Sequence, residues 1–117
     1  MYIKLAAVLL IFFGESFSII AELVASKRIA ASDGAGYLNI LFWPSVLIVL
    51  GGAMLIVGYM LGYLHFKNIW IIAAVSIGSL LVAEPVLAFA LFRETPTTGA
   101  VIGLTLGALG TLAALFI

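Results

Sequence analysis

Three glutamates lie inside long apolar stretches of this 117-residue chain, at Glu15, Glu22 and Glu84. A carboxylate in the middle of a membrane helix is costly unless it is paired, hydrated or protonated. Glu15 has similar lengths of apolar chain on either side, which predicts a position near the bilayer centre. Since such residues usually face a bundle interior or a water-filled cavity, Glu15 is the principal candidate for a proton and substrate site.

The first apolar stretch carries more than one polar residue at helical spacing. Glu15, Ser18 and Glu22 are separated by three, four and seven positions, so a helix places them on one face. Two turns separate the two carboxylates, which is ~10 Å along the helix axis. The sequence therefore predicts a polar stripe, with Ser18 and Glu22 as auxiliary members of the site.

The elements that must position this stripe are membrane helices. The chain is 66% hydrophobic and only 9% charged, which leaves too little polar surface to cover a soluble domain. We therefore predict an all-α membrane protein, in which residues 1–117 form a single four-helix transmembrane domain with short loops. Each apolar segment has about the ~20 residues that a bilayer span needs. The predicted spans are 3–25, 42–64, 69–92 and 96–117.

Polar segments predict the connections between these spans. Ser26–Asn39 reads as a loop, and a tight turn is expected around His65–Asn68. Pro44 suits the first turn of the second helix, where its missing N–H does no harm. Thr95 is expected to cap the fourth helix, with Pro96 as its first residue.

Four spans place both termini on one side, together with Lys4, His65 and Lys67; the other side then carries Lys27, Arg28 and Arg93. One side thus carries two lysine or arginine residues and the other side carries three. This near balance gives only a weak orientation signal and permits insertion in both orientations. Counting back from the basic ends puts Glu84 between the depths of Glu22 and Glu15. The three carboxylates would converge on one cavity if their helix faces meet.

Apolar surroundings favour the neutral form of a carboxyl group, so such a site can hold a proton and release it to a cation. Each carboxyl also has a structural interpretation. In that interpretation Glu15 is protonated and hydrogen-bonded to another helix, and Glu22 pairs with Lys27 or Arg28. Glu84 then hydrogen-bonds to the backbone that Pro85 leaves without a donor.

Four glycines follow each other along the fourth segment, and they permit close helix packing within the chain or across a dimer. They are Gly99, Gly103, Gly107 and Gly110. Other classes of function are disfavoured. No nucleophile motif or phosphate loop is present, so we expect no enzyme. One histidine and no cysteine predict no metal site, and zero net charge argues against a nucleic-acid partner.

Trp43-Pro44-Ser45-Val46 opens the second segment, and Arg93-Glu94-Thr95-Pro96 precedes the spaced glycines. In the type and order of these motifs the chain resembles the small multidrug resistance family of the drug/metabolite transporter superfamily. Glu84-Pro85-Val86 is similar to a motif of the larger, ten-helix members. Ala21-Glu22-Leu23 and Ser32-Asp33-Gly34 resemble local family motifs, whereas Glu15 matches the family's glutamate in depth. The resemblance leaves open which glutamate is equivalent.

The resemblance implies an antiparallel, dual-topology homodimer, or a dimer with a related chain, in a cell membrane such as a prokaryotic inner membrane. Its first three helices would line a cavity and its fourth would dimerise. The chain lacks the family's aromatic pair in the third helix and carries Glu84 in addition.

We therefore expect a proton-coupled exporter of small cationic or amphipathic compounds, embedded in membrane lipid, with no cofactor besides the coupling proton. The alternatives are a flippase for a lipid-linked sugar or related amphiphile, and a non-transporting subunit of a larger complex.

Overall fold

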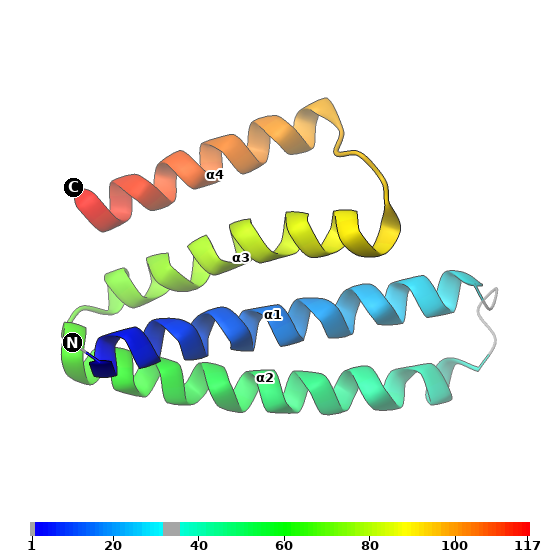
Figure 1. The fold of residues 1–117 in the computed structure, drawn as a ribbon, viewed down its shortest axis with the longest axis horizontal. Helices are drawn as coiled ribbons and strands as arrows, with labels where there is room; N and C mark the ends of the chain where they lie inside the picture. The colour runs from blue at the N-terminus through cyan, green and yellow to red at the C-terminus, as the bar shows by residue number, and fades with distance from the viewer. Residues whose placement is uncertain (1, 32–35) are drawn as a thin grey trace.

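The computed structural model describes residues 2–31 and 36–117. The described chain consists of helices that run alternately up and down, and it contains no strand (Figure 1). The helices are α1 (Tyr2–Ala31), α2 (Tyr37–Phe66), α3 (Ile69–Phe92) and α4 (Thr98–Phe116). Each is long and apolar enough to cross a membrane. The prediction of an all-helical chain with four such segments is thus confirmed, and the fold is compatible with a multi-pass membrane protein.

The first two helices extend beyond the predicted spans, whereas α3 has the predicted bounds. The predicted loop Ser26–Asn39 is wrong at both ends, because α1 continues to Ala31 and α2 begins at Tyr37. Residues 32–35, which include the Ser32-Asp33-Gly34 motif, lie outside the described residues. The Ser26 hydroxyl donates to the Glu22 carbonyl, and the lysine, arginine and alanines that follow are good helix formers. A polar segment can therefore remain helical beyond the apolar stretch.

Two predicted helix starts are also wrong. Thr97 rather than Thr95 caps α4, since its hydroxyl accepts the Ala100 N–H at 3.1 Å and the helix begins one residue later, at Thr98. Pro96 consequently lies outside the helix. Pro44 lies inside α2 rather than in its first turn, because α2 starts earlier than the apolar pattern suggests.

Short connections join the last three helices. The tight turn predicted around His65–Asn68 is present: Lys67 ends α2 with a φ of 58°, and the Asn68 side chain accepts the Trp70 N–H of α3. Arg93 ends α3 in the same left-handed conformation. These connections fix the antiparallel order of α2, α3 and α4.

Glycines allow α1 and α2 to pack with their backbones nearly in contact. A Cβ atom at Gly14 would lie 2.8 Å from the carbonyl oxygen of Gly51, and a Cβ at Gly51 would lie 2.8 Å from that of Gly14. A Cβ at Gly58 would lie 2.8 Å from Ile11 Cγ1. Such distances leave no room for any side chain, so this contact, the α1–α2 seam, is the closest helix packing in the described chain.

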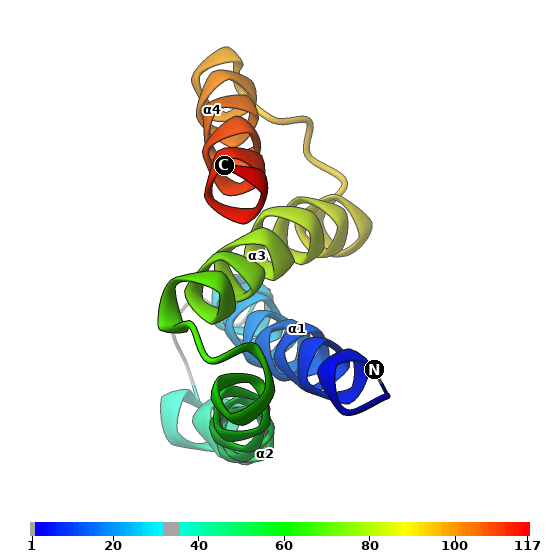
Figure 2. The same ribbon diagram turned by 90° about the vertical axis from the view of Figure 1, so that its left-hand side faces the viewer.

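The remaining helices form a layered arrangement in which α3 lies between α1 and α4 (Figures 1 and 2). Ile11 and Ile72 are almost fully buried at the level where α1, α2 and α3 meet. By contrast, α4 contacts α3 alone and has no buried residue. The outermost helix is therefore held far less firmly than the other three.

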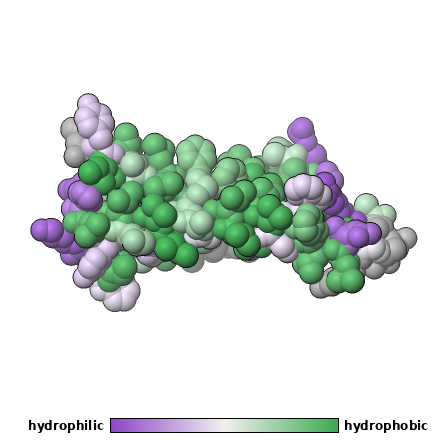
Figure 3. Space-filling view, turned by 90° about the horizontal axis from the view of Figure 1, so that it is seen from below, coloured by the Kyte–Doolittle hydropathy of each residue, from purple (hydrophilic) through white to green (hydrophobic). Residues whose placement is uncertain are grey.

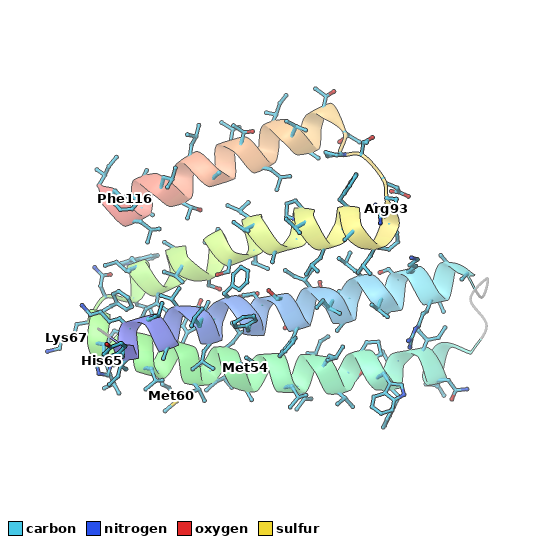
Figure 4. All side chains as sticks on the ribbon, in the orientation of Figure 1. Met54, Met60, His65, Lys67, Arg93 and Phe116 are labelled. Atoms are coloured by element: carbon cyan, nitrogen blue, oxygen red, sulfur yellow. The ribbon has the colours of Figure 1, made fainter. Side chains whose placement is uncertain are left out.

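The two ends of the bundle carry the polar residues, and apolar side chains cover the middle (Figure 3). His65, Lys67 and Phe116 lie at one end and Arg93 at the other (Figure 4). The Lys4 ammonium lies 5.2 Å from the centre of the Phe66 ring, and the Lys27 ammonium donates to the Leu91 carbonyl. The predicted sorting of these basic residues between the two ends is thus confirmed.

Candidate functional site

Glu15 is half-buried on α1, where it meets a polar side chain of another helix. The Ser76 hydroxyl of α3 donates a hydrogen bond to Glu15 Oε1 at 2.5 Å. Ser76 is only 6% exposed, so its hydroxyl is largely buried inside the helix bundle. Within residues 2–31 and 36–117, Glu15 makes no ion pair, and its carboxyl group therefore has a hydroxyl rather than a fixed cation as its partner.

The α1–α2 seam positions this carboxyl group. Gly14, the residue before Glu15, is pressed against the backbone of Gly51. Ile11 and Ile19, one turn before and one turn after Glu15, are almost fully buried. Because α2 and the two isoleucines fix the rotation of α1 at this level, the Glu15 side chain is directed to α3, where Ser76 accommodates it.

The structure divides the predicted polar stripe between two neighbouring helices. Ser18 lies against α2, since a Cβ at Gly51 would be 2.9 Å from its hydroxyl oxygen. That hydroxyl donates to the Gly14 carbonyl of its own helix at 3.1 Å. Ser18 therefore belongs to the α1–α2 seam and does not contact the same helix as Glu15.

Glu22 is exposed on α1, two turns beyond Glu15. Lys27, one of its two expected partners, instead donates to the Leu91 carbonyl at 2.7 Å. The described residues give the Glu22 carboxylate no hydrogen bond or ion pair. Glu22 is thus accessible from outside the three-helix core, and nothing in one chain buries it.

Glu84 is exposed on α3 and lines a cleft between α3 and α4. It lies eight residues after Ser76, which turns it by ~80° around the helix axis and away from α1. Two hydrogen bonds connect α1 and α3, one between Glu15 and Ser76 and one between Lys27 and Leu91, and their partners are 61 and 64 positions apart in the sequence. With the same offsets, Glu84 lies level with residues 20 to 23 of α1. Glu84 therefore lies close to the level of Glu22, and one chain does not bring it to Glu15.

A smaller, apolar pocket of about 330 Å³ lies between α1 and α3. Phe12, Phe13 and Phe17 contribute aromatic rings from α1, and Ala83 and Leu87 line it from α3. The Ser16 hydroxyl at its edge donates to the Phe12 carbonyl and so presents little polarity. The aromatic rings that line this pocket all belong to α1.

Sequence reasoning missed Ser76 as the partner of Glu15. Both α1 and α3 run toward the same basic end, and this parallel alignment places residues near 76 at the level of Glu15. The sequence did show a serine at that level of the third segment, and this serine could have identified the partner. The phenylalanines of α1 were visible too, but only the observed packing shows that they face α3.

Among the described residues, no group of three or more histidine, cysteine or acidic side chains is placed to hold a metal ion. Comparisons with protein-family models, with curated proteins and with solved structures found no match to this chain. The chemistry must therefore be argued from the site itself. A carboxyl group bonded to a hydroxyl on a second helix can take up or release a proton and can attract a cation.

Proposed function

We propose that this protein is a small membrane transporter that exchanges protons for small cationic or amphipathic compounds. Glu15 is the proton and substrate site in this proposal, and Ser76 positions its carboxyl group. The observation that carries the proposal is the hydrogen bond between them, in the middle of a membrane-spanning helix and without a permanent cation. A purely structural carboxyl group would gain more from a basic partner in such surroundings.

The Ser76 hydroxyl suits a carboxyl group that changes its protonation state. A hydroxyl donates to an ionised carboxylate and accepts from a protonated one, so it is a partner in both states. A lysine or arginine would instead hold the carboxylate permanently ionised. Protonation and cation binding then compete for Glu15, and this competition is the minimum that coupled exchange requires.

We also propose that two chains form the transport unit, with α4 at their interface. Gly99, Gly103 and Gly110 have no atom within 4 Å of the position where a Cβ would be added, so this side of α4 is open for close approach. The near balance of basic residues at the two ends permits antiparallel insertion. Reporter fusions at the C-terminus test this: reporters found on both sides of the membrane support it, and a single fixed side overturns the antiparallel arrangement.

Proteoliposomes provide the test of the transport proposal. A dye inside the vesicles reports proton movement when monovalent organic ammonium compounds are added on one side. We expect coupled proton movement with the wild-type chain, and none with Glu15→Gln. Glu22→Gln is the matched control, because it removes an exposed carboxylate from the same helix and should retain most of the coupling.

Other results would identify the alternatives. A flippase would move a fluorescent lipid-linked sugar between leaflets without a pH gradient and would show no coupled proton movement. A non-transporting subunit would do neither and would depend on another chain to remain dispersed after purification. Unchanged proton coupling in Glu15→Gln would contradict the role of Glu15 in proton exchange.

A further inference from the structure

The contact between α3 and α4 leaves a cleft of about 820 Å³ that is separate from the Glu15–Ser76 site. The two helices approach each other near Leu81, since a Cβ at Gly107 would lie 3.0 Å from Leu81 Cδ2. A Cβ at Gly78 would likewise lie 3.1 Å from Thr111 Cγ2. Beyond these contacts the helices separate toward the loop that connects them (Figures 1 and 2). The volume of the cleft falls in the range of small-molecule sites.

Apolar residues line this cleft on both sides of Glu84. Ile77, Leu80 and Leu104 form the inner part, and Ala88, Phe89 and Phe92 lie between Glu84 and the polar residues of the loop. Glu84 lies ~10 Å along the helix axis from Ile77. A carboxylate next to a long apolar inner part matches a molecule with a polar head and an apolar chain.

The head must be a cation. The cleft is lined by two carboxylates, Glu84 and Glu94, and by no lysine, arginine or histidine among the described residues. Glu84 is exposed toward this space and has no hydrogen bond or ion pair within the described chain. A positively charged group would supply the partner that a carboxylate needs in apolar surroundings.

A backbone acceptor next to Glu84 narrows the choice of cation. Pro85 has no N–H, so the carbonyl oxygen of Leu81, one turn earlier, lacks its usual helical donor. Leu81, Glu84 and Pro85 all line the cleft. A primary ammonium group has three N–H donors and can bond to the carboxylate and to this carbonyl together, whereas a quaternary ammonium group can donate to neither.

We infer that the α3–α4 cleft binds a single-chain primary amine, with its ammonium group held by Glu84 and the Leu81 carbonyl and its chain along Ile77, Leu80 and Leu104. Within the described residues α4 packs against α3 alone, so a compound can reach the cleft from the surrounding membrane without passing another helix. This inference goes beyond the proposed proton exchange and does not depend on Glu15.

Photolabelling of the full-length protein in lipid nanodiscs tests the inference. The probe is dodecylamine carrying a diazirine near the end of its chain, and labelled peptides are located by mass spectrometry. We expect label on the cleft residues of α3 and α4, reduced about tenfold in Glu84→Gln, since hydrogen bonds to charged groups are the stronger ones. Glu22→Gln is the matched control at the same membrane level and should label as the wild type does.

Two competitors sharpen the result. Unlabelled dodecylamine should displace the probe, whereas dodecanol and dodecyltrimethylammonium should compete about tenfold less well, because neither offers the charged donor to Glu84 and Leu81. A variant that fills the cleft, Ala100→Trp, should lose the label while retaining the helical circular dichroism of the wild type.

Several results would overturn the inference. One is labelling that is equal in Glu84→Gln and wild type, and another is equal competition by the quaternary amine. A third is the absence of label from the cleft in well-folded protein. A fourth is a disulfide between two copies of an Ala100→Cys variant that forms fully and abolishes labelling, because a second chain would then occupy the cleft.

Discussion

The α1–α2 seam and the α3–α4 contact join helices of similar composition in opposite ways. In the seam, Gly14 and Gly51 bring two backbones together so closely that no side chain fits between them. Across the α3–α4 contact, the Leu81 side chain reaches Gly107, and most of the remaining length encloses a cleft. Glycine content therefore does not by itself predict tight packing, because how closely two helices approach also depends on the facing side chains.

This difference separates two kinds of carboxyl site. Glu15 lies next to the seam, and its position is fixed by buried neighbours and by Ser76. Glu84 lies on the loosely packed side of α3, where a ligand can reach it. A site that exchanges protons requires a defined geometry, while a site that admits compounds of varied length requires space. The two proposed sites use different faces of α3, since Ser76 and Glu84 are ~80° apart around its axis.

The largest expected effect comes from adding a methyl group to the seam. Gly51→Ala should lower the free energy of unfolding by about 1–3 kcal/mol, because its Cβ would meet the Gly14 carbonyl and the Ser18 hydroxyl. Gly52→Ala is the control, since nothing lies within 4 Å of that position. Unfolding in detergent, followed by circular dichroism, measures both. Equal stabilities of the two variants would show that the seam is not as close as described.

An intermediate effect is expected from the bond between α1 and α3. Ser76→Ala should cost about 0.5–1.5 kcal/mol of stability through the lost hydrogen bond to Glu15, and it should also weaken proton coupling in proteoliposomes. Ser79→Ala is a close match, because Ser79 is similarly buried but bonds only to the Val75 carbonyl of its own helix. Equal proton coupling in Ser76→Ala and Ser79→Ala would contradict a specific role for the hydrogen bond between Ser76 and Glu15.

The smallest effect is expected across the α3–α4 contact. Gly107→Ala should change the stability of the chain by less than about 0.5 kcal/mol, because the facing Leu81 side chain can move aside. Gly103→Ala meets nothing within the chain and should leave its stability unaltered. If Gly103→Ala instead reduces dimerisation while Gly107→Ala does not, the open side of α4 is the interface between copies.

The sequence predicted those parts of the fold that depend on apolar length and on charge placement. The bounds of α3 follow from a predominantly apolar run between Asn68 and Arg93, and the basic residues sort to the two ends as expected. It did not predict the full length of α1, because a helix does not end where apolar residues end. Lys27 and Arg28 continue it as readily as the residues before them.

The candidate site depended on a quantity that the sequence does not state, which is the rotation of each helix about its axis. The positions of Glu15, Ser18 and Glu22 on one side of α1 left open whether α2 or α3 would face each residue. The Gly14–Gly51 contact sets this rotation, and it directs Ser18 to α2 and Glu15 to Ser76. Glu84 turned out to face α4 for the same reason, since α3 is rotated to present Ser76 to α1.

The central claim is that Glu15, bonded to Ser76, is the group that gains and loses the coupling proton. Infrared difference spectra between acid and alkaline pH report the carbonyl stretch of protonated carboxyl groups directly. We predict a band that shifts in Ser76→Ala, disappears in Glu15→Gln, and shows no further change when both substitutions are combined. A spectrum in which Glu15→Gln removes no carboxyl band, or in which Ser76→Ala shifts none, would contradict the account.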